Sequence, residues 1–357
     1  MSEANNRQYL DQLLLATAEN GASDLHVSPG HFPSIRVDGR LIQITGTQIL
    51  DPETSSGVVM ELVGPERKDR FLSEKELDFS HEYAGKYRFR VNAYHTRGGI
   101  AASLRLIPNE IRTPEELNLP PIVKIFSRLS QGFVLVVGPN GHGKSTTLAS
   151  IVNLINRERA EKIVTVEDPI EYIFTPDKSI IDQREIYQDT FSFHKAIRST
   201  FRQNVNVILV GEMRDYETMS AAVTAAETGH LVFASLHTNS ASQTIERIID
   251  SFPPNQQSQV RSQLANTISG VISQRLIQGV RGGLIPAVEV MIATTAVRTL
   301  IRDNRPRQLD LVIETSQDVG MIPIDRSLAD LVRRKEITME RAEFYSSNPM
   351  ELRNQLK

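Results

Sequence analysis

The ten residues GPNGHGKSTT at positions 138–147 decide the fold, because they directly follow the apolar run FVLVV at positions 133–137. A glycine-rich turn between a buried strand and a helix points backbone N–H groups at a bound phosphate. The stretch fits the pattern G-x-x-x-x-G-K-[ST] at all four fixed positions. The sequence therefore predicts a P-loop that binds a nucleoside triphosphate.

The loop residues have distinct expected roles. Lys144 neutralises the β- and γ-phosphate oxygens, and the Ser145 hydroxyl is a ligand for Mg²⁺. ATP is favoured over GTP because no Asn-Lys-x-Asp element, which would read guanine, follows in the sequence. The residues expected to line the phosphates are Gly138, Pro139, Asn140, Gly141, His142, Gly143, Lys144, Ser145 and Thr146.

Composition excludes several other classes of protein. The chain has 357 residues, and 40 basic against 43 acidic residues give a net charge of −3, which provides no basic field for a nucleic-acid backbone. With no cysteine, thiol catalysis, disulfides and cysteine-ligated zinc are excluded. No apolar run approaches the ~18 residues of a membrane span, and the N-terminus MSEANNRQYL does not resemble a signal peptide. We expect a cytoplasmic protein.

The pattern of the chain changes near residue 110. Short alternating segments such as 86–95 and 100–107 precede this point and predict an antiparallel α+β domain over residues 1–107. Four prolines in PNEIRTPEELNLPP predict a linker over 108–121. Apolar runs that alternate with helical segments then predict an α/β ATPase domain over 122–357, with a mainly parallel sheet and a helical C-terminal part. One helix is expected over 256–277, on the stripe Val260, Leu264, Ile268, Val271 and Ile272.

Polar residues follow the apolar strands, where ligands bind in a parallel sheet. Glu212 is a candidate for the Mg²⁺ shell or for orienting the attacking water, although an acid at a helix N-terminus is also stabilised by the helix dipole. Glu167 competes for the water-activating role, with Asp168 beside it in the same phosphate-and-metal site. His237 can sense the γ-phosphate or contact the attacking water, and a histidine that only supports neighbouring residues is the alternative. His230, at the start of the same strand, is expected to be structural.

Arginines of the N-terminal half are a further candidate group. Arg88 and Arg90 alternate with apolar residues and so point to one face of a strand, and Arg105 and Arg112 lie before and within the linker. Arginines that reach a γ-phosphate accelerate hydrolysis by about 10³ to 10⁵. From the residues alone, a solvated strand face is the default interpretation.

These stretches together resemble the PilT-type pilus-retraction ATPases. The likeness runs from SDLHV (23–27) to SNPMELRNQL (347–356) and rests on five motifs: GPNGHGKSTT (138–147), TVEDPIEY (165–172), ILVGEMRD (208–215), AAETGHLVFASLHT (225–238) and GGLIPAVEVM (282–291). The resemblance implies a PAS-like N-terminal domain and a RecA-like ATPase domain. It also implies a cytoplasmic homohexamer, peripheral to the inner membrane at the base of a type IV pilus. There, ATP turnover would move a PilC-like platform protein, possibly beside a second retraction ATPase.

The resemblance also assigns residues. Glu167 and Asp168 match the aspartate box, Glu212 the Walker B glutamate, and His230 with His237 the histidine box. The arginines that would approach the nucleotide are Arg90, Arg105 and Arg112. The LIPA segment, together with the lack of a further N-terminal domain and of a tetracysteine element, favours retraction over extension.

The chain departs from the family pattern at three places. His142 replaces the usual serine of the loop, Gly282 replaces an alanine, and Asn206 stands where the family has an aspartate. If that aspartate anchors a strand, activity survives its loss; if it tunes the metal site, hydrolysis is slow. The departures leave two alternatives open, an accessory paralogue of the PilU kind and a nucleotide-gated scaffold. A nucleic-acid motor is a third alternative, because it shares the RecA-like core and the hexamer.

Overall fold

The computed structural model describes residues 3–37, 39–107 and 110–356. It divides into two compact units, Met1–Glu110 with Pro169–Ile173, and Ile111–Asp168 with Phe174–Lys357. The division after residue 110 falls inside the expected linker 108–121, whose first two residues lie outside the described part of the chain. Each unit has its own sheet and hydrophobic core.

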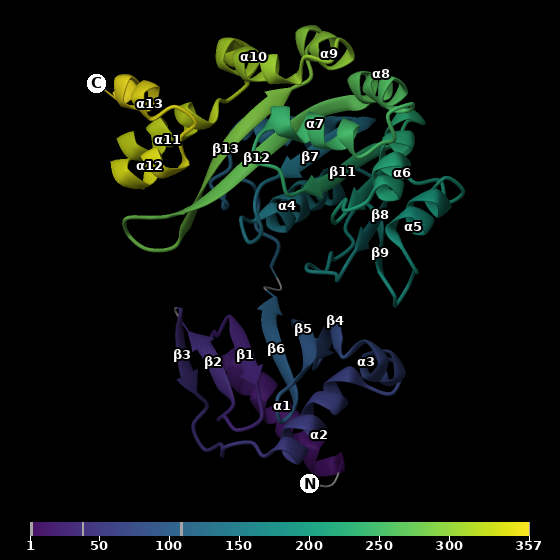
Figure 1. Ribbon diagram of the computed structural model, residues 1–357, viewed down its shortest axis with the longest axis vertical. Helices are drawn as coiled ribbons and strands as arrows, with labels where there is room; N and C mark the ends of the chain where they lie inside the picture. Colours follow the sequence, from purple (N-terminus) through teal and green to yellow (C-terminus); the bar gives the residue numbers. More distant parts are fainter. Residues whose placement is uncertain (1–2, 38, 108–109, 357) are drawn as a thin grey trace. The chain divides into compact units, whose positions relative to one another are not determined.

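Among the described residues, the first unit contains an antiparallel six-stranded sheet in the order β3-β2-β1-β6-β5-β4 (Figure 1). Its strands are β1 Asp24–Val27, β2 Ser34–Val37, β3 Arg40–Gln43, β4 Glu76–Tyr83, β5 Tyr87–Thr96 and β6 Gly99–Ile107. Its helices are α1 Glu3–Glu19, α2 Pro52–Val63 and α3 Lys68–Glu74. Apolar residues of α1 and α2 share one core with the strands, so these helices cover one face of the sheet.

Strand β5 shows how the sequence pattern sets the two faces of this sheet. Phe89, Val91 and Ala93 are buried in the core, and Arg88 and Arg90 alternate with them on the opposite face. This is the period of two that an extended chain imposes. The sequence expectation that both arginines share one face is therefore confirmed.

The second unit, as far as it is described, is built on a seven-stranded sheet in the order β13-β12-β7-β11-β10-β8-β9. All neighbouring strands are parallel except the pair β12 and β13. The strands are β7 Gly132–Val137, β8 Lys162–Glu167, β9 Ile180–Glu185, β10 Val207–Val210, β11 Leu231–Leu236, β12 Ile268–Gln278 and β13 Leu284–Ile292. β7, β10 and β11 are buried at every residue, as expected for strands whose two faces are both covered.

The helices of this unit follow its strands in the chain, except η1, which precedes its first strand β7. They are η1 Pro121–Arg128, α4 Lys144–Glu158, α5 Phe193–Thr200, α6 Tyr216–Glu227, α7 Ala241–Asp250, α8 Gln257–Thr267, α9 Thr295–Arg302, η2 Pro306–Gln308, α10 Leu309–Thr315, η3 Gln317–Val319, α11 Ile324–Arg333, α12 Met339–Tyr345 and α13 Pro349–Leu356. Helices α11 to α13 form a small core with the hairpin of β12 and β13. The predicted fold class is confirmed.

One sequence prediction is wrong. The expected helix over 256–277 ends at Thr267, where α8 stops, and the chain continues as strand β12. The apolar stripe did not distinguish the two structures, because β12 lies between β7 and β13 and is buried on both faces. The long hairpin of β12 and β13 extends past the ends of the other strands (Figure 1).

Candidate nucleotide-binding site

The polar residues that follow the parallel strands meet at one edge of the second sheet. β7, β11, β10 and β8 pair in register, with Val137 opposite Leu236 and Val210 opposite Ala234 and Val166. The segments 138–145, 167–168, 211–214 and 237–240 therefore lie together at the carboxyl ends of these strands.

The P-loop turns sharply through glycines. Gly138, Gly141 and Gly143 have φ values of 149°, 75° and 79°, a region that other residues rarely adopt. A Cβ at Gly138 would lie 2.4 Å from the carbonyl oxygen of Gln274, and one at Gly143 would lie 2.8 Å from Gln274 Nε2. Glycine is thus required at position 138 for conformation and for space, because a backbone atom stands in the way, and at position 143 for conformation. α4 begins at Lys144, so its N-terminal N–H groups and dipole face the loop.

Lys144 is buried at the centre of the loop, with 8% of its surface exposed. Its Nζ donates to the carbonyl oxygens of Gly138 and Pro139 at 2.9 and 3.0 Å, and to His237 Nδ1 at 3.2 Å. These contacts hold the ammonium group inside the loop, where phosphate oxygens can replace them as partners.

His237 connects this lysine to Glu212. Its Nε2 lies 2.6 Å from Glu212 Oε1, while its Nδ1 accepts from Lys144. Because an ammonium group only donates, this network is satisfied by the tautomer with the proton on Nε2. The histidine therefore bridges the phosphate-binding lysine and the carboxylate at the end of β10.

Arg214 is the second partner of Glu212. Its Nη2 lies 2.9 Å from Glu212 Oε2, and its Nη1 lies 3.8 Å from Asp168 Oδ2. Burial opposes ionisation of Glu212, but the hydrogen bond and charge of Arg214, together with His237, outweigh burial and hold the pKa of Glu212 below its ordinary value. Glu212 is therefore a carboxylate at neutral pH, as both a metal ligand and a water-orienting group require.

Glu167 lies in a different environment. It is buried, accepts a hydrogen bond of 2.6 Å from the Thr165 hydroxyl on its own strand, and lies 3.5 Å from Gln183 Nε2 on β9. The described contacts of Glu167 thus face β8 and β9, whereas those of Glu212 lead to the loop lysine.

Several residues of this site were missed by sequence reasoning. Gln274 of β12 donates to the His142 carbonyl at 2.8 Å and accepts from the Thr147 hydroxyl at 2.7 Å. Arg214 and Gln183 were also missed. Gln274 is 127 positions from Thr147, and no local pattern marks such a contact. The available signal was the polar run Ser273, Gln274 and Arg275 between the apolar residues of 268–277.

His230 and Asn206 lie at the opposite, amino-terminal end of the strands. His230 precedes β11, contacts the Ala225 carbonyl oxygen at 3.0 Å through Nδ1, and packs on Phe201 with ring centroids 5.5 Å apart. Asn206 accepts from the Lys162 backbone N–H at 2.9 Å, just before β10 begins. The structure does not bring either side chain to the P-loop.

The three arginines predicted to approach the nucleotide belong to different units. In the first unit, Arg90 pairs with Glu171 and Arg105 pairs with Asp24, each at 3.0 Å. Arg112 is an exposed residue of the second unit, just after its start at Ile111.

The donor set suits Mg²⁺ rather than a softer metal. Ser145 lies in the first turn of α4 and contributes a hydroxyl, and Asp168 and Glu212 contribute carboxylates at the same sheet edge. Oxygen ligands supplemented by phosphate and water are what Mg²⁺ prefers. Within the described residues, no group of three or more His, Cys, Asp or Glu side chains could hold a metal without such help.

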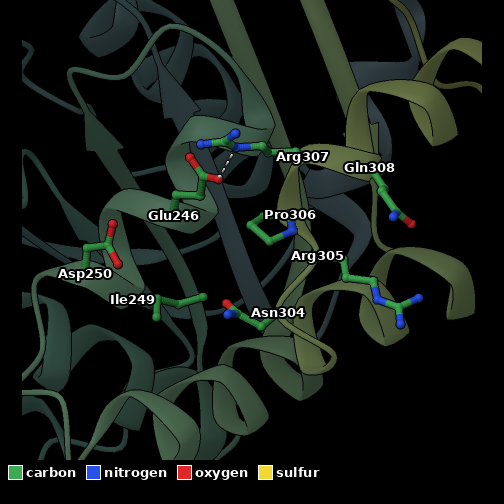
Figure 2. Close-up of a pocket in the computed structure, with 8 residues that line it drawn as sticks. All are labelled: Glu246, Ile249, Asp250, Asn304, Arg305, Pro306, Arg307 and Gln308. Carbon is green, nitrogen blue, oxygen red and sulfur yellow. Dashed lines mark hydrogen bonds and ion pairs between the residues drawn. The ribbon is translucent and has the colours of Figure 1, made fainter.

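A separate pocket of about 360 Å³ lies between α7 and the segment around η2 (Figure 2). Figure 2 shows Glu246 and Asp250 on one side of it and Arg305 and Arg307 on the other. Arg307 pairs with Glu246 at 3.4 Å, and none of the lining residues belongs to the P-loop. This pocket is distinct from the nucleotide-binding site.

Comparison with known proteins identifies the family. The model of the family described as type II/IV secretion system protein matches residues 2–287, and the chain belongs to this family. Within it, the chain is 43% identical over 333 residues to the type IV pilus retraction ATPase PilT of Pseudomonas aeruginosa, covering 93% of this chain and 96% of that protein. It is 37% identical over 348 residues to the type IV pilus ATPase PilU of the same organism, covering 97% of this chain and 91% of that protein.

A solved structure agrees with these relatives. The crystal structure of the pilus retraction motor PilT with bound ADP superposes with a TM-score of 0.89 and 41% identity, covering 96% of this chain and 98% of that one. The resemblance to PilT-type ATPases is therefore confirmed, and the protein is a nucleotide-binding P-loop ATPase of this type. Among the described residues, no helix is both long and apolar enough to cross a membrane.

Proposed function

We propose that this protein is a motor ATPase that uses ATP hydrolysis to retract type IV pili. The observation that carries the proposal is the continuous contact from Lys144 to His237 and from His237 to Glu212. This connection links the group that binds phosphate to the carboxylate that can act on water. The similarity to PilT along nearly the whole chain supports pilus retraction as the work done.

In the proposed mechanism, Lys144 binds the β- and γ-phosphate oxygens in place of its present carbonyl partners. Glu212 orients the attacking water, and His237 holds the carboxylate in position and responds when Lys144 engages the γ-phosphate. Glu212 is preferred for this role because its contact with His237 leads to the loop lysine.

Mg²⁺ is the proposed cofactor. Ser145 would hold it directly, and Asp168 and Glu212 would hold it directly or through water. When bound, the ion neutralises charge on the phosphate oxygens during hydrolysis.

We further propose that the chain works as a homohexamer at the cytoplasmic face of the inner membrane, on a PilC-like platform protein and possibly beside a second retraction ATPase. In the assembled motor, Arg90, Arg105 and Arg112 would complete the nucleotide environment, whereas His230 would remain a structural residue at the amino end of β11. We expect Leu284 in the GGLIPA segment to contact the platform protein, because 62% of this apolar residue is exposed.

The second candidate function is that of an accessory paralogue with weak hydrolysis. It depends on whether Asn206, which stands where the family has an aspartate, slows hydrolysis. The hydrogen bond from Lys162 to Asn206 lies at the amino end of the strands. This position supports an anchoring role for residue 206, and therefore favours an active motor over a slow paralogue.

The test is steady-state ATP turnover with Mg²⁺ for the wild type, Lys144→Ala and Glu212→Gln, with the oligomeric mass determined in the same buffer. Lys162→Ala is the matched lysine control, since Lys162 pairs with Asp182 at the amino end of the strands. Turnover by a hexamer, lost in both site variants and kept in the control, supports the motor. Nucleotide binding and assembly without turnover would overturn it in favour of an accessory subunit.

A further inference from the structure

Strand β12 runs beside the P-loop. β7 and β12 pair in parallel up to Val137 and Ser273, after which β7 turns into the loop and β12 continues to Gln278. Residues 274–276 of β12 therefore lie where β7 no longer provides backbone partners. Backbone N–H groups in such a place need another acceptor, because an unpaired buried donor is costly.

His142 supplies that acceptor. The backbone N–H of Leu276 donates to His142 Nδ1 at 3.0 Å, while Gln274 Nε2 donates to the carbonyl oxygen of the same histidine at 2.8 Å. His142 is thus bound to β12 through both its side chain and its backbone. The serine that is usual at this place is one bond shorter in reach, because its Oγ is bonded to Cβ whereas the histidine Nδ1 is bonded to Cγ. Its hydroxyl could therefore not occupy the position of Nδ1.

The protonation state of His142 agrees with this contact. Burial, followed by the nearby charges of Arg275 and Lys144, holds the pKa of His142 below its ordinary value. At neutral pH the ring is therefore uncharged, which is the form whose Nδ1 can accept a hydrogen bond.

We infer that His142 is a positioning residue, which ties the P-loop to strand β12 and thereby holds the phosphate-binding N–H groups of the loop in place. The loop bends at Gly141 and Gly143, whose backbones are conformationally free, so contacts with neighbouring elements must hold it in shape. A loop held in its bound conformation loses less entropy when it binds phosphate. The inference rests on the proposed ATPase function of this site.

The test compares three substitutions. His142→Leu introduces an apolar side chain of similar size that has no hydrogen-bond acceptor. His142→Asn places an amide oxygen, which can accept a hydrogen bond, at the position of Nδ1. His31→Leu makes the same chemical change at an exposed histidine of the first unit. The readouts are the Kd for ADP by titration calorimetry, kcat and KM for ATP, and the melting temperature.

We expect His142→Leu to raise the Kd for ADP and the KM for ATP about three- to tenfold, the range of one neutral hydrogen bond, with kcat changed less than about twofold. His142→Asn should remain within about twofold of the wild type in both, as should His31→Leu. Equal effects of Leu and Asn, or no change in Kd for Leu, would overturn the inference.

If His142→Leu does not fold, His142→Ser replaces it, with the same expected loss because the hydroxyl does not reach Leu276. The ADP titration separates this inference from the proposed function. A wild type without turnover would count against the motor, while the pattern of ADP affinities would still decide the role of His142.

Discussion

The two histidines that flank strand β11 have different environments. His230 precedes the strand, contacts the backbone carbonyl of Ala225 and packs on Phe201. His237 follows the strand, about 20 Å further along by the rise of an extended chain, and bridges Lys144 and Glu212. The same residue type is therefore a local structural group at one end of the sheet and part of a reactive network at the other.

The difference between the two ends follows from the parallel sheet. At the amino end, Asn206 likewise bonds to backbone, at the Lys162 N–H. At the carboxyl end, the loop, the carboxylates and His237 come from different strands and contact one another. Parallel strands place all their following loops at one edge, so functional side chains accumulate there.

The largest effect is expected for Glu212→Gln, the removal of the carboxylate that His237 and Arg214 hold. We expect kcat for ATP to fall about 10²- to 10⁴-fold, because an amide cannot orient and deprotonate water as a carboxylate does. Steady-state turnover with Mg²⁺ measures this. Glu167→Gln should lower kcat less; a larger loss for Glu167→Gln would transfer the water-orienting role to Glu167.

The histidine pair is the next test. His237→Ala should lower kcat about 10²-fold, because Glu212 loses one of its two partners. His230→Ala should leave the kcat of each active site within about threefold and lower the melting temperature by a few degrees instead. Comparable losses of kcat in both variants would show that the amino end of β11 also acts on the nucleotide.

Leu284→Ala tests the tip of the hairpin of β12 and β13. Leu284 is exposed, whereas its neighbour Ile285 packs against the C-terminal core, so Leu284 can be changed without loosening that core. We expect retraction events per cell to fall about tenfold, because the variant loses an apolar contact with the platform protein. ATPase activity should stay within about twofold of the wild type. Joint loss of both activities would show that the segment is part of the structural core.

The buried Glu289 differs from Glu212 in its pKa, which is raised and not lowered. It accepts from the Ala241 N–H at 2.8 Å, but burial raises its pKa to about 7. Since the folded state holds this proton more tightly than the unfolded state, stability should fall as pH rises from about 4.5 to 7, by roughly 3 kcal/mol.

Glu289→Gln should remove this part of the pH dependence. Urea unfolding of the wild type and the variant at pH 5 and pH 8 measures it. A constant difference in free energy of unfolding between the two proteins at both values would contradict the raised pKa.

The smallest effect is expected for Asn206→Asp, which restores the residue that is usual in the family. Because residue 206 binds the Lys162 backbone at the amino end of the sheet, kcat should change less than about twofold. A tenfold increase in kcat would mean that this position tunes the metal site after all.

The sequence predicted the parts of the fold that depend on local pattern. The glycine turn with its lysine and serine, the apolar runs before it, and the acidic ends of the strands could all be located from neighbouring residues. The helix expected over 256–277 was wrong past Thr267, because a strand buried on both faces has no alternation to distinguish it from a buried helix.

The sequence by itself determined that this protein has a P-loop, a parallel sheet and an N-terminal α+β unit, because each follows from short-range spacing and composition. Only the tertiary structure decided which side chains meet: His237 with Lys144, Gln274 with Thr147, and His142 with Leu276. These pairs are 93 to 134 positions apart, and strand order and register alone bring them together.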